Sequence, residues 1–264
     1  MEIPFDIISR VKEKKPLIHC ITNPISINQC ANAILALGAL PIMAEHPKEV
    51  KEITRQADAL LLNLGNITDA RIKSIKLSLK TAKKQGIPVV LDVVGTACSG
   101  LRLKLAKKLL KIGGISVLKG NYSEINILRH PDSKSGGVDA SSYLKTEHLI
   151  PVCFELSKKH NCTILASGKE DIVCGSGKTV LVANGTPSLQ RITGTGCLQG
   201  AIVATYASQG QSFEAAILGA VSMGICGEMA EGEGNYLANL MDSIGKICPE
   251  NIKNKMEVTE LEKF

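Results

Sequence analysis

Short apolar segments of four or five residues alternate along the chain with longer segments in which apolar residues recur every three or four positions. The short segments predict strands, and the longer ones predict amphipathic helices. The expected strands are 17–21, 40–43, 59–63, 88–92, 115–119 and 163–166, and the expected helices are 26–37, 47–55, 68–85, 101–111, 122–128 and one ending near residue 160. Several strands are apolar throughout, which is typical of a parallel sheet covered on both faces.

After residue 163 the pattern changes. Two β-rich runs at 171–174 and 179–182 flank a Gly-Ser-Gly segment and predict a hairpin. The remaining predicted segments are a loop at 130–139, a helical third at 198–247 and a charged C-terminal tail at about 250–264. No linker or change of composition divides the chain, so we expect one α/β domain over residues 1–264, with helices on both faces of the sheet.

Composition and charge narrow the classes of partner. Hydrophobic residues make up 44% and charged residues 21%, and the net charge of +6 is spread as lysines along helix faces such as 101–111. With no Trp, four Phe and four Tyr, the chain has few rings on which bases could stack. Apolar runs such as 31–44 are too short to span a bilayer. We therefore expect no nucleic-acid partner and no membrane partner.

The cysteines bear on the cellular compartment. There are nine, without a C-x-x-C pair, and the first residues lack the basic and apolar regions of a secretory leader. We expect reduced, mostly buried thiols in a cytoplasmic protein.

The strongest motif is Thr-Gly-Thr-Gly-Cys at 193–197, followed directly by an apolar run that predicts a helix. Gly194 and Gly196 permit a tight turn whose N–H groups point the same way, next to the free N–H groups of the helix start. Such a cup of donors at the positive end of a helix dipole favours a phosphoryl group. The alternative is a glycine-rich connection with no ligand.

Two other phosphate-binding motifs do not fit. The segment Gly194-x-Gly196 is followed by a glycine at 200 instead of 199, so the dinucleotide fingerprint is missing. The segment Gly177-Lys178-Thr179 resembles the end of a P-loop, but Ile172 stands where that motif needs glycine, and the segment lies in the predicted hairpin.

Acidic residues follow two of the predicted strands. Asp92 closes one strand, and Asn121 and Glu124 open the helix after the next, three residues apart and so on one face. Because ligands of doubly wound sheets bind at the carboxyl ends of the strands, these residues are candidates for holding a nucleotide-bound Mg²⁺. Asn121 and Glu124 could instead form only a helix capping box, and Asp92 could only fix the turn after its strand.

The order of the motifs along about residues 15–245 resembles the hydroxyethylthiazole kinase family of the ribokinase-like superfamily. The matching segments are 19–23, 30–32, 41–44, 57–60, 91–95, 120–125, 136–139 and 193–197. Cys197 is the specific member of this set, because related sugar kinases carry Asp at its position. An ordered run of motifs is a stronger signal than any one of them alone.

The resemblance implies a three-layer αβα fold with a mostly parallel central sheet and a helical C-terminal third. It implies transfer of the γ-phosphoryl group of ATP, with Mg²⁺, to the hydroxyl of 4-methyl-5-(2-hydroxyethyl)thiazole in thiamine biosynthesis or salvage. It also implies a homotrimer with active sites at the subunit interfaces. The site residues that it implies are Met43, Asn23 and Gly194 for the thiazole alcohol, Lys119, Ser167 and Asn121 for ATP, Asp92 and Glu124 for Mg²⁺, and Gly194, Thr195, Gly196 and Cys197 for catalysis.

The chain departs from the family pattern at three places. Lys119 stands for the usual Arg and lacks the planar fork that matches a phosphate, which puts the affinity for ATP in question. Ser167 stands for the usual Thr and keeps the hydroxyl. Val93 replaces a Pro that is common after this Asp, without removing a ligand.

Cys197 is the candidate for proton transfer. At a helix N-terminus we expect the pKa of its thiol to be lowered, which would let it accept the proton of the alcohol. The backbone N–H groups of 194–197 would take up the charge on the transferred group. Phosphoryl transfer passes through a loose transition state that asks little of a base, and a small residue packed at a crowded helix start is the alternative.

Three other functions remain open at this point. The same fold could serve a hydroxymethylpyrimidine or sugar kinase, or an ADP-dependent hydro-lyase. A nucleotide-binding regulator without turnover is a third possibility, which the intact Asp92, Glu124 and glycine motif disfavour.

Overall fold

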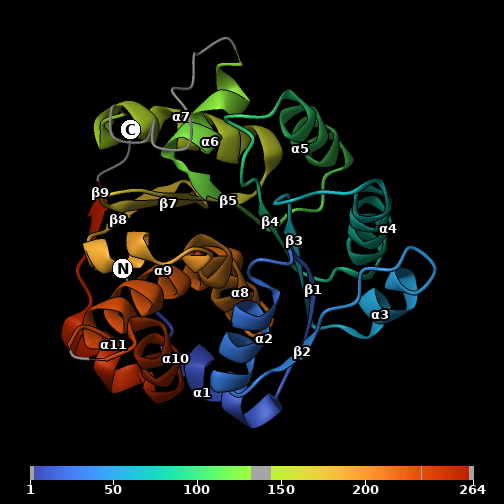
Figure 1. Ribbon diagram of the computed structural model, residues 1–264. Coiled ribbons are helices and arrows are strands. Elements are labelled where there is room, and N and C mark those ends of the chain that lie inside the picture. The colour runs from blue at the N-terminus through green and yellow to red at the C-terminus, as the bar shows by residue number, and fades with distance from the viewer. Residues whose placement is uncertain (1–2, 132–143, 233, 262–264) are drawn as a thin grey trace.

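A nine-stranded sheet runs through the part of the chain that the computed structural model describes, residues 3–131, 144–232 and 234–261 (Figure 1). Its strands are β1 (Leu17–Ile21), β2 (Leu40–Ile42), β3 (Ala59–Asn63), β4 (Val89–Asp92), β5 (Val117–Asn121), β6 (Thr163–Ser167), β7 (Asp171–Gly175), β8 (Lys178–Val182) and β9 (Val258–Leu261). The spatial order is β2-β1-β3-β4-β5-β6-β7-β8-β9. Strands β1 to β6 pair in parallel, and β7, β8 and β9 join antiparallel. The predicted, mostly parallel sheet is confirmed.

Helices cover both faces of this sheet (Figure 1). One layer contains α1 (Asp6–Lys14), α2 (Ile27–Ala36), α8 (Thr195–Ala207), α9 (Ser212–Met229), α10 (Tyr236–Lys246) and α11 (Pro249–Lys255). The other contains α3 (Val50–Gln56), α4 (Asp69–Gln85), α5 (Gly100–Ile112), α6 (Tyr122–Arg129) and α7 (Thr146–His160). Successive strand residues face opposite layers: Leu61 packs in the core on the α8 side, and Leu60 and Leu62 pack in the other core. The predicted three-layer αβα fold is confirmed.

Local signals in the sequence explain where helices begin and end. The Thr68 hydroxyl accepts a hydrogen bond from the N–H of Arg71 at the start of α4, and Gly86 ends that helix with φ = 70°. The strand predicted at 115–119 lies two residues further along, so Lys119 is inside β5 instead of closing it. The predicted loop at 130–139, with the motif at 136–139, falls almost entirely outside the described residues.

The expectation of a charged C-terminal tail at about 250–264 is wrong for the described residues up to 261. They form α11 and β9, with Ile252 fully buried and β9 paired antiparallel to β8. The segment is short, and its charged side chains face outward around few apolar ones, so its pattern hides its role as an edge strand and covering helix.

Helix α9 is the one described helix whose length and mean hydropathy would allow it to cross a membrane. Of its residues, 78% are buried inside the structure. The helix packs against the sheet and between α8 and α10, at the centre of one core. Its apolar character therefore reflects packing on all sides.

Candidate active site

The polar residues that the sequence places at strand ends lie in one row along the carboxyl edge of the sheet. The parallel register sets Asn63 of β3 beside Asp92 of β4, and Asp92 beside Lys119 of β5. On the next pair of strands, Asn121 lies beside Ser167. These residues are 27 to 46 positions apart in pairs, yet the sheet brings them together, because parallel strands end at the same edge.

Lys119 and Asp92 form a buried ion pair at the centre of this row. The ammonium donates to Asp92 Oδ2 at 3.2 Å, and the side chains are 3% and 2% exposed. The other carboxylate oxygen of Asp92 accepts from the N–H of Val94 at 3.0 Å, so Asp92 also fixes the turn after its strand. Burial is the largest single influence and lowers the pKa of Lys119, but the acidic groups around it, Asp92 first and then Cys197 and Glu124, together outweigh burial, so the pKa of Lys119 is raised. Lys119 therefore carries a positive charge into the site.

Glu124 and Asn121 form the capping box that was the alternative interpretation of this pair. Asn121 Oδ1 accepts from the N–H of Glu124 at 2.9 Å, and Glu124 Oε2 accepts from the N–H of Asn121 at 2.8 Å. Glu124 Oε1 accepts from the N–H of Gly95 at 2.6 Å. Burial and the nearby Asp92 raise the pKa of Glu124. The negative charges of Asp92 and Glu124 thus lie close enough to repel each other.

The glycine motif opens α8 beside Lys119. Gly194 is the N-cap residue with φ = 88°, and no side chain caps the helix. The φ of 88° strains any other residue at Gly194, and a Cβ there would also lie 2.5 Å from Gln29 Oε1 and 3.2 Å from Ser26 Cβ. A Cβ at Gly196 would lie 3.6 Å from the Lys119 ammonium, which places that charge against the first turn. Uncapped N–H groups beside a buried cation form a site for an anion.

The side chain of Thr195 serves the loop itself. Its hydroxyl lies 3.0 Å from the carbonyl oxygen of Leu189 and 3.3 Å from that of Ile192, both of which accept hydrogen bonds. These bonds hold the turn that delivers the glycines to the helix start. Thr195 therefore contributes to the anion site through its backbone and through the shape of its loop.

Cys197 is buried, and the expectation of a lowered thiol pKa is wrong. Burial, and after it the negative charge of Asp92, raise the pKa of Cys197, although hydrogen bonds and Lys119 act in the opposite direction. The helix start favours a thiolate by only a modest amount, and the cost of desolvating the charge is larger. At neutral pH Cys197 is a thiol.

The residues expected to contact the alcohol follow the two outermost parallel strands. Met43 follows β2 and is half-buried against the core on the α8 side. The buried His19 of β1 donates from Nε2 to the carbonyl oxygen of Ala44 at 2.8 Å and so holds the segment that carries Met43. Asn23 is buried after β1 and donates a hydrogen bond to Cys197.

Ser167, a residue expected to contact ATP, ends β6. Its Oγ donates to the Gly120 carbonyl on the neighbouring β5 at 3.4 Å.

Two residues of this edge, the fully buried Asn63 and the half-buried Asp171, were not among the sequence candidates. Asn63 closes β3 and donates to Cys197 Sγ at 3.2 Å. Asp171 accepts from Gln199 Nε2 at 2.6 Å and from the N–H of Gly168 at 3.1 Å, and burial raises its pKa to about 6. The signal for Asn63 was present in the sequence, because it ends an apolar strand as Asp92 does.

The carboxylates fit a nucleotide-bound Mg²⁺ but not a metal held by protein alone. Within the described ranges no group of three or more His, Cys, Asp and Glu side chains could hold a metal ion. Asp92 and Glu124 offer hard oxygen donors that face one space and repel each other, which a divalent cation would relieve. Each of their oxygens already accepts one hydrogen bond, so contact through water suits them better than a closed cage.

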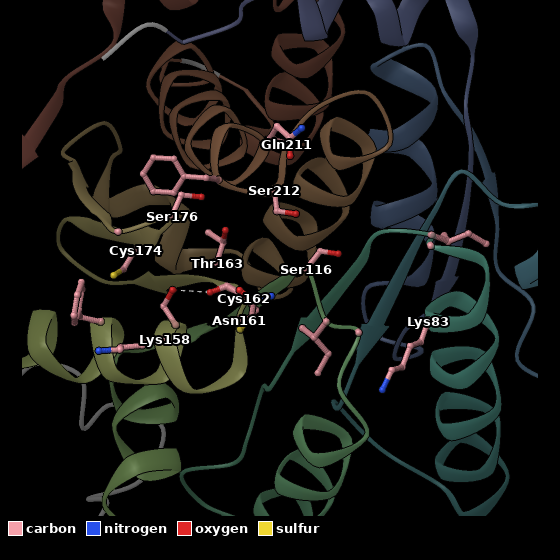
Figure 2. A pocket seen from close by; sticks show the side chains of 18 residues that line it. Lys83, Ser116, Lys158, Asn161, Cys162, Thr163, Cys174, Ser176, Gln211 and Ser212 are labelled. Atoms are coloured by element: carbon pink, nitrogen blue, oxygen red, sulfur yellow. Dashed lines mark hydrogen bonds between the residues drawn. The ribbon is translucent and has the colours of Figure 1, made fainter.

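A cavity of about 690 Å³ lies elsewhere, at the amino ends of the parallel strands (Figure 2). Figure 2 shows Ser116, Thr163, Ser212 and Lys83 around it, from the starts of β5 and β6, the start of α9, and α4. None of the residues predicted for the site lines it. This cavity and the convergent polar groups of the carboxyl edge therefore lie at opposite ends of the strands.

The fold of the chain is similar to that of known ribokinase-like proteins. A ribokinase-like superfamily protein from Enterococcus faecalis V583 superposes with a TM-score of 0.63 at 16% identity, covering 92% of this chain and 88% of that one. The pyridoxal kinase of Staphylococcus aureus superposes with a TM-score of 0.68 at 12% identity, covering 94% and 98%. At these identities the likeness concerns the fold.

Closer relatives give the family. The model of the Hydroxyethylthiazole kinase family matches residues 8–250. Hydroxyethylthiazole kinase 2 of Clostridium botulinum (strain Langeland) is 44% identical over 96% of this chain and 98% of its own length, and hydroxyethylthiazole kinase of Finegoldia magna is 42% identical over 97% and 96%. A hydroxyethylthiazole kinase protein from Pyrococcus horikoshii OT3 superposes with a TM-score of 0.90 at 32% identity, covering 99% and 100%. The chain belongs to the hydroxyethylthiazole kinase family.

Proposed function

We propose that this protein transfers the γ-phosphoryl group of ATP to the primary hydroxyl of 4-methyl-5-(2-hydroxyethyl)thiazole, a step of thiamine biosynthesis or salvage. Family membership supports the reaction class and the substrate. The observation that carries the proposal is the Lys119 ammonium beside the uncapped start of α8, within reach of Asp92. A cation and aligned N–H groups stabilise the charge of a transferring phosphoryl group.

The transfer forms a bond between the alcohol oxygen and the γ-phosphorus and breaks the bond from that phosphorus to the β,γ-bridging oxygen, releasing ADP. Lys119 balances negative charge on the phosphates, and the N–H groups of 194–197 receive the equatorial oxygens. Bound Mg²⁺, held by Asp92 and Glu124, would neutralise further phosphate charge. In this proposal Ser167 and Asn121, neighbours at the ends of β6 and β5, would contact the nucleotide.

Cys197 takes the proton of the alcohol in this proposal, as the thiolate. Its raised pKa keeps the thiolate a minor form at neutral pH, so the backbone donors supply the larger share of the stabilisation. A loose transition state allows this, because little negative charge develops on the attacking oxygen early in the reaction. Met43 and Asn23 would then hold the alcohol near Cys197.

Two substitutions test the role of Cys197. We expect Cys197→Ala to lower kcat by roughly tenfold or less, with the KM of the alcohol little changed, because the cup of N–H groups remains. We expect Cys197→Asp to match or exceed wild-type turnover, because a carboxylate at this helix start is ionised at neutral pH and the thiol is not. An inactive Asp variant beside a fully active Ala variant would assign Cys197 to packing alone.

We propose a homotrimer in which a neighbouring copy completes each site. Three exposed apolar side chains, Ile25 (63%), Leu35 (52%) and Leu40 (49%), lie around α2 and the edge strand β2, next to the segment with Met43. Apolar side chains gathered in one region of a surface mark an interface. Light scattering should give a trimer whose activity falls on dilution, and a fully active monomer would contradict it.

The cellular setting that we propose is the cytoplasm. All nine cysteines are free, and seven of them are buried. Reduced thiols of this kind suit a reducing compartment. The proposal is checked by fractionating cells of the source organism and locating the protein by immunoblot.

The reaction is tested by coupled ADP release with and without the thiazole alcohol. We expect ADP release that depends on the alcohol, with one phosphorylated alcohol formed per ADP. Hydroxymethylpyrimidine, pyridoxal and sugars serve as alternative acceptors, and hydro-lyase activity is followed separately as water loss from a hydrated substrate. Preference for another acceptor by more than tenfold in kcat/KM would reassign the substrate, and ATP binding without turnover would favour the regulator.

A further inference from the structure

Two asparagine side chains converge on the sulfur of Cys197. Asn23 Nδ2 donates to Sγ at 3.3 Å, and Asn63 Nδ2 donates to the same atom at 3.2 Å. The three residues come from the loop after β1, the end of β3 and the first turn of α8. Asn63 is fully buried, and Asn23 and Cys197 are 5% and 8% exposed.

The surrounding backbone fixes which way each carboxamide points. Asn23 Oδ1 accepts from the N–H groups of Ile25 and Ser26 at 3.1 and 3.2 Å. Asn63 Oδ1 accepts from the N–H of Gly65 at 2.8 Å and from Asn23 Nδ2 at 3.1 Å. Because a backbone N–H can only donate, the oxygens must face these groups, and both Nδ2 atoms are left facing the sulfur.

Gly65 makes this arrangement possible. A Cβ there would lie 2.8 Å from Asn63 Oδ1 and 2.9 Å from Asn23 Nδ2, so a side chain would push the two carboxamides out of place. The N–H of Gly65 can therefore approach Asn63 closely while the carboxamides keep contact with each other.

A sulfur atom that faces two N–H donors is held as an acceptor. A thiol is a weak acceptor, whereas a thiolate or a carboxylate at the same place is a strong one. Asn23 keeps 5% of its surface exposed toward a bound alcohol, whereas Asn63 has none and acts on the reacting atoms only through Cys197. The charged groups that act on the sulfur are Lys119, which favours negative charge on it, and Asp92, which opposes it.

We propose that Asn63 is a positioning residue that acts through Cys197: its carboxamide holds the Sγ atom in place and stabilises negative charge there when the alcohol loses its proton. The inference rests on the proposed function, in which Cys197 accepts that proton. The same two donors suit a carboxylate, which accounts for the expectation that Cys197→Asp is active.

The test is a double-mutant cycle on the full-length enzyme. With Cys197 present, Asn63→Ala should lower kcat by roughly three- to tenfold and leave the KM values of ATP and the alcohol within twofold. In the Cys197→Ala background the same change should cost less than twofold, because no acceptor is left for Asn63 to hold. A loss confined to structure would appear equally in both backgrounds.

Two further variants separate an effect on catalysis from a loss of stability. Ser222→Ala removes a buried hydrogen bond to the Tyr206 hydroxyl (3.1 Å) between α8 and α9, and should lower the Tm without changing kcat. If Asn63→Ala does not fold, Asn63→Ser keeps a hydroxyl that can accept from Gly65 or donate to the sulfur, and a smaller loss of kcat is expected, again only with Cys197 present.

The outcomes separate the inference from the proposed function. Equal losses in both backgrounds, an unchanged kcat in Asn63→Ala, or wild-type turnover in Cys197→Ala would each overturn the role of Asn63. Absence of alcohol-dependent ADP release by the wild-type enzyme would instead overturn the proposed reaction.

Discussion

The two ends of the parallel strands differ in how their buried polar groups find partners. At the carboxyl ends side chains bond one another across strands, Asn23 with Asn63 and Lys119 with Asp92. At the amino ends, around the cavity, polar side chains bond the backbone. Ser116 Oγ accepts from the N–H of Val89 at 3.0 Å, and Ser157 Oγ donates to the Cys162 carbonyl at 2.7 Å.

This difference indicates which end of the strands carries the chemistry. Neutral side chains such as Ser116 and Ser157 that bond the backbone serve the fold, and their loss affects stability. A buried ion pair such as that of Lys119 and Asp92 costs desolvation and adds little net stability, so its presence is better explained by function. The cavity is an open space whose described lining residues include no charged partners arranged across strands, whereas the carboxyl edge holds the Lys119 and Asp92 pair that can act on a ligand.

The largest effect is expected at Asp92. Asp92→Asn removes the charge opposite Lys119 and one of the two carboxylates offered to Mg²⁺. We expect kcat to fall by about 10²-fold or more, with a higher Mg²⁺ requirement, and excess EDTA to abolish wild-type activity. The control is Ser116→Ala at the amino ends, which should lower the Tm and leave kcat unchanged. Full activity in excess EDTA would remove the metal from the site.

The next effect is expected at Lys119. Lys119→Ala should raise the KM of ATP by about tenfold and that of the alcohol much less, because the phosphates lose their cation. Lys119→Arg should be neutral or better, since a planar fork matches a phosphate. Initial rates at varied ATP and fixed alcohol measure both, and an unchanged KM of ATP in the Ala variant would show that the ammonium serves Asp92 alone.

A smaller effect concerns stability at mildly acid pH. Burial lowers the pKa of His19 below the ordinary 6.5. Between the folded pKa and 6.5 the unfolded state binds more protons, so the free energy of unfolding should decrease as the pH falls below 6.5. Asp171, with its pKa raised to about 6, acts in the opposite direction below that pH. Denaturation midpoints from pH 7.5 to 5.5 should therefore fall less steeply in His19→Gln than in the wild type, and parallel slopes would contradict this.

The smallest effect is expected at the cavity. Lys158 lines it from α7 and is exposed, and Lys158→Trp would narrow the space. We expect kcat and both KM values to stay within twofold of wild type, because the proposed site lies at the other end of the strands. A larger change in any of these constants would mean that the two ends of the sheet are coupled.

Much of the fold could be predicted from the sequence because its strands are continuous apolar runs. The apolar runs that end in Asn63 and in Asp92 predict buried parallel strands, and the structure confirms both. The edge strand β9 could not be predicted in the same way, because only its two end residues are partly buried and the two between them are exposed. An edge strand contacts the sheet too little to impose a pattern.

The site residues also differ in how well they could be predicted from the sequence. Asp92, Lys119 and Glu124 were visible as charged residues at strand ends, and parallel register brings them together. Asn63 occupies the same kind of position, but an uncharged amide at the end of a strand is a weaker signal than a carboxylate. The pKa of Cys197 depends on burial and on Asp92, which lies 105 positions earlier, and neither is a property of the local motif.

The edge strand β2 limits how copies of this chain can join. The N–H of Leu40 donates to the Pro16 carbonyl at 2.9 Å on the side of β1, so the backbone of Pro41 turns outward, and proline has no N–H to offer. A strand from another molecule finds no donor at the middle of this edge, and growth of the sheet into a fibre is blocked there. In the proposed homotrimer, copies would meet here through the side chains of Ile25, Leu35 and Leu40, and the missing donor at Pro41 would keep the same surface from open-ended aggregation.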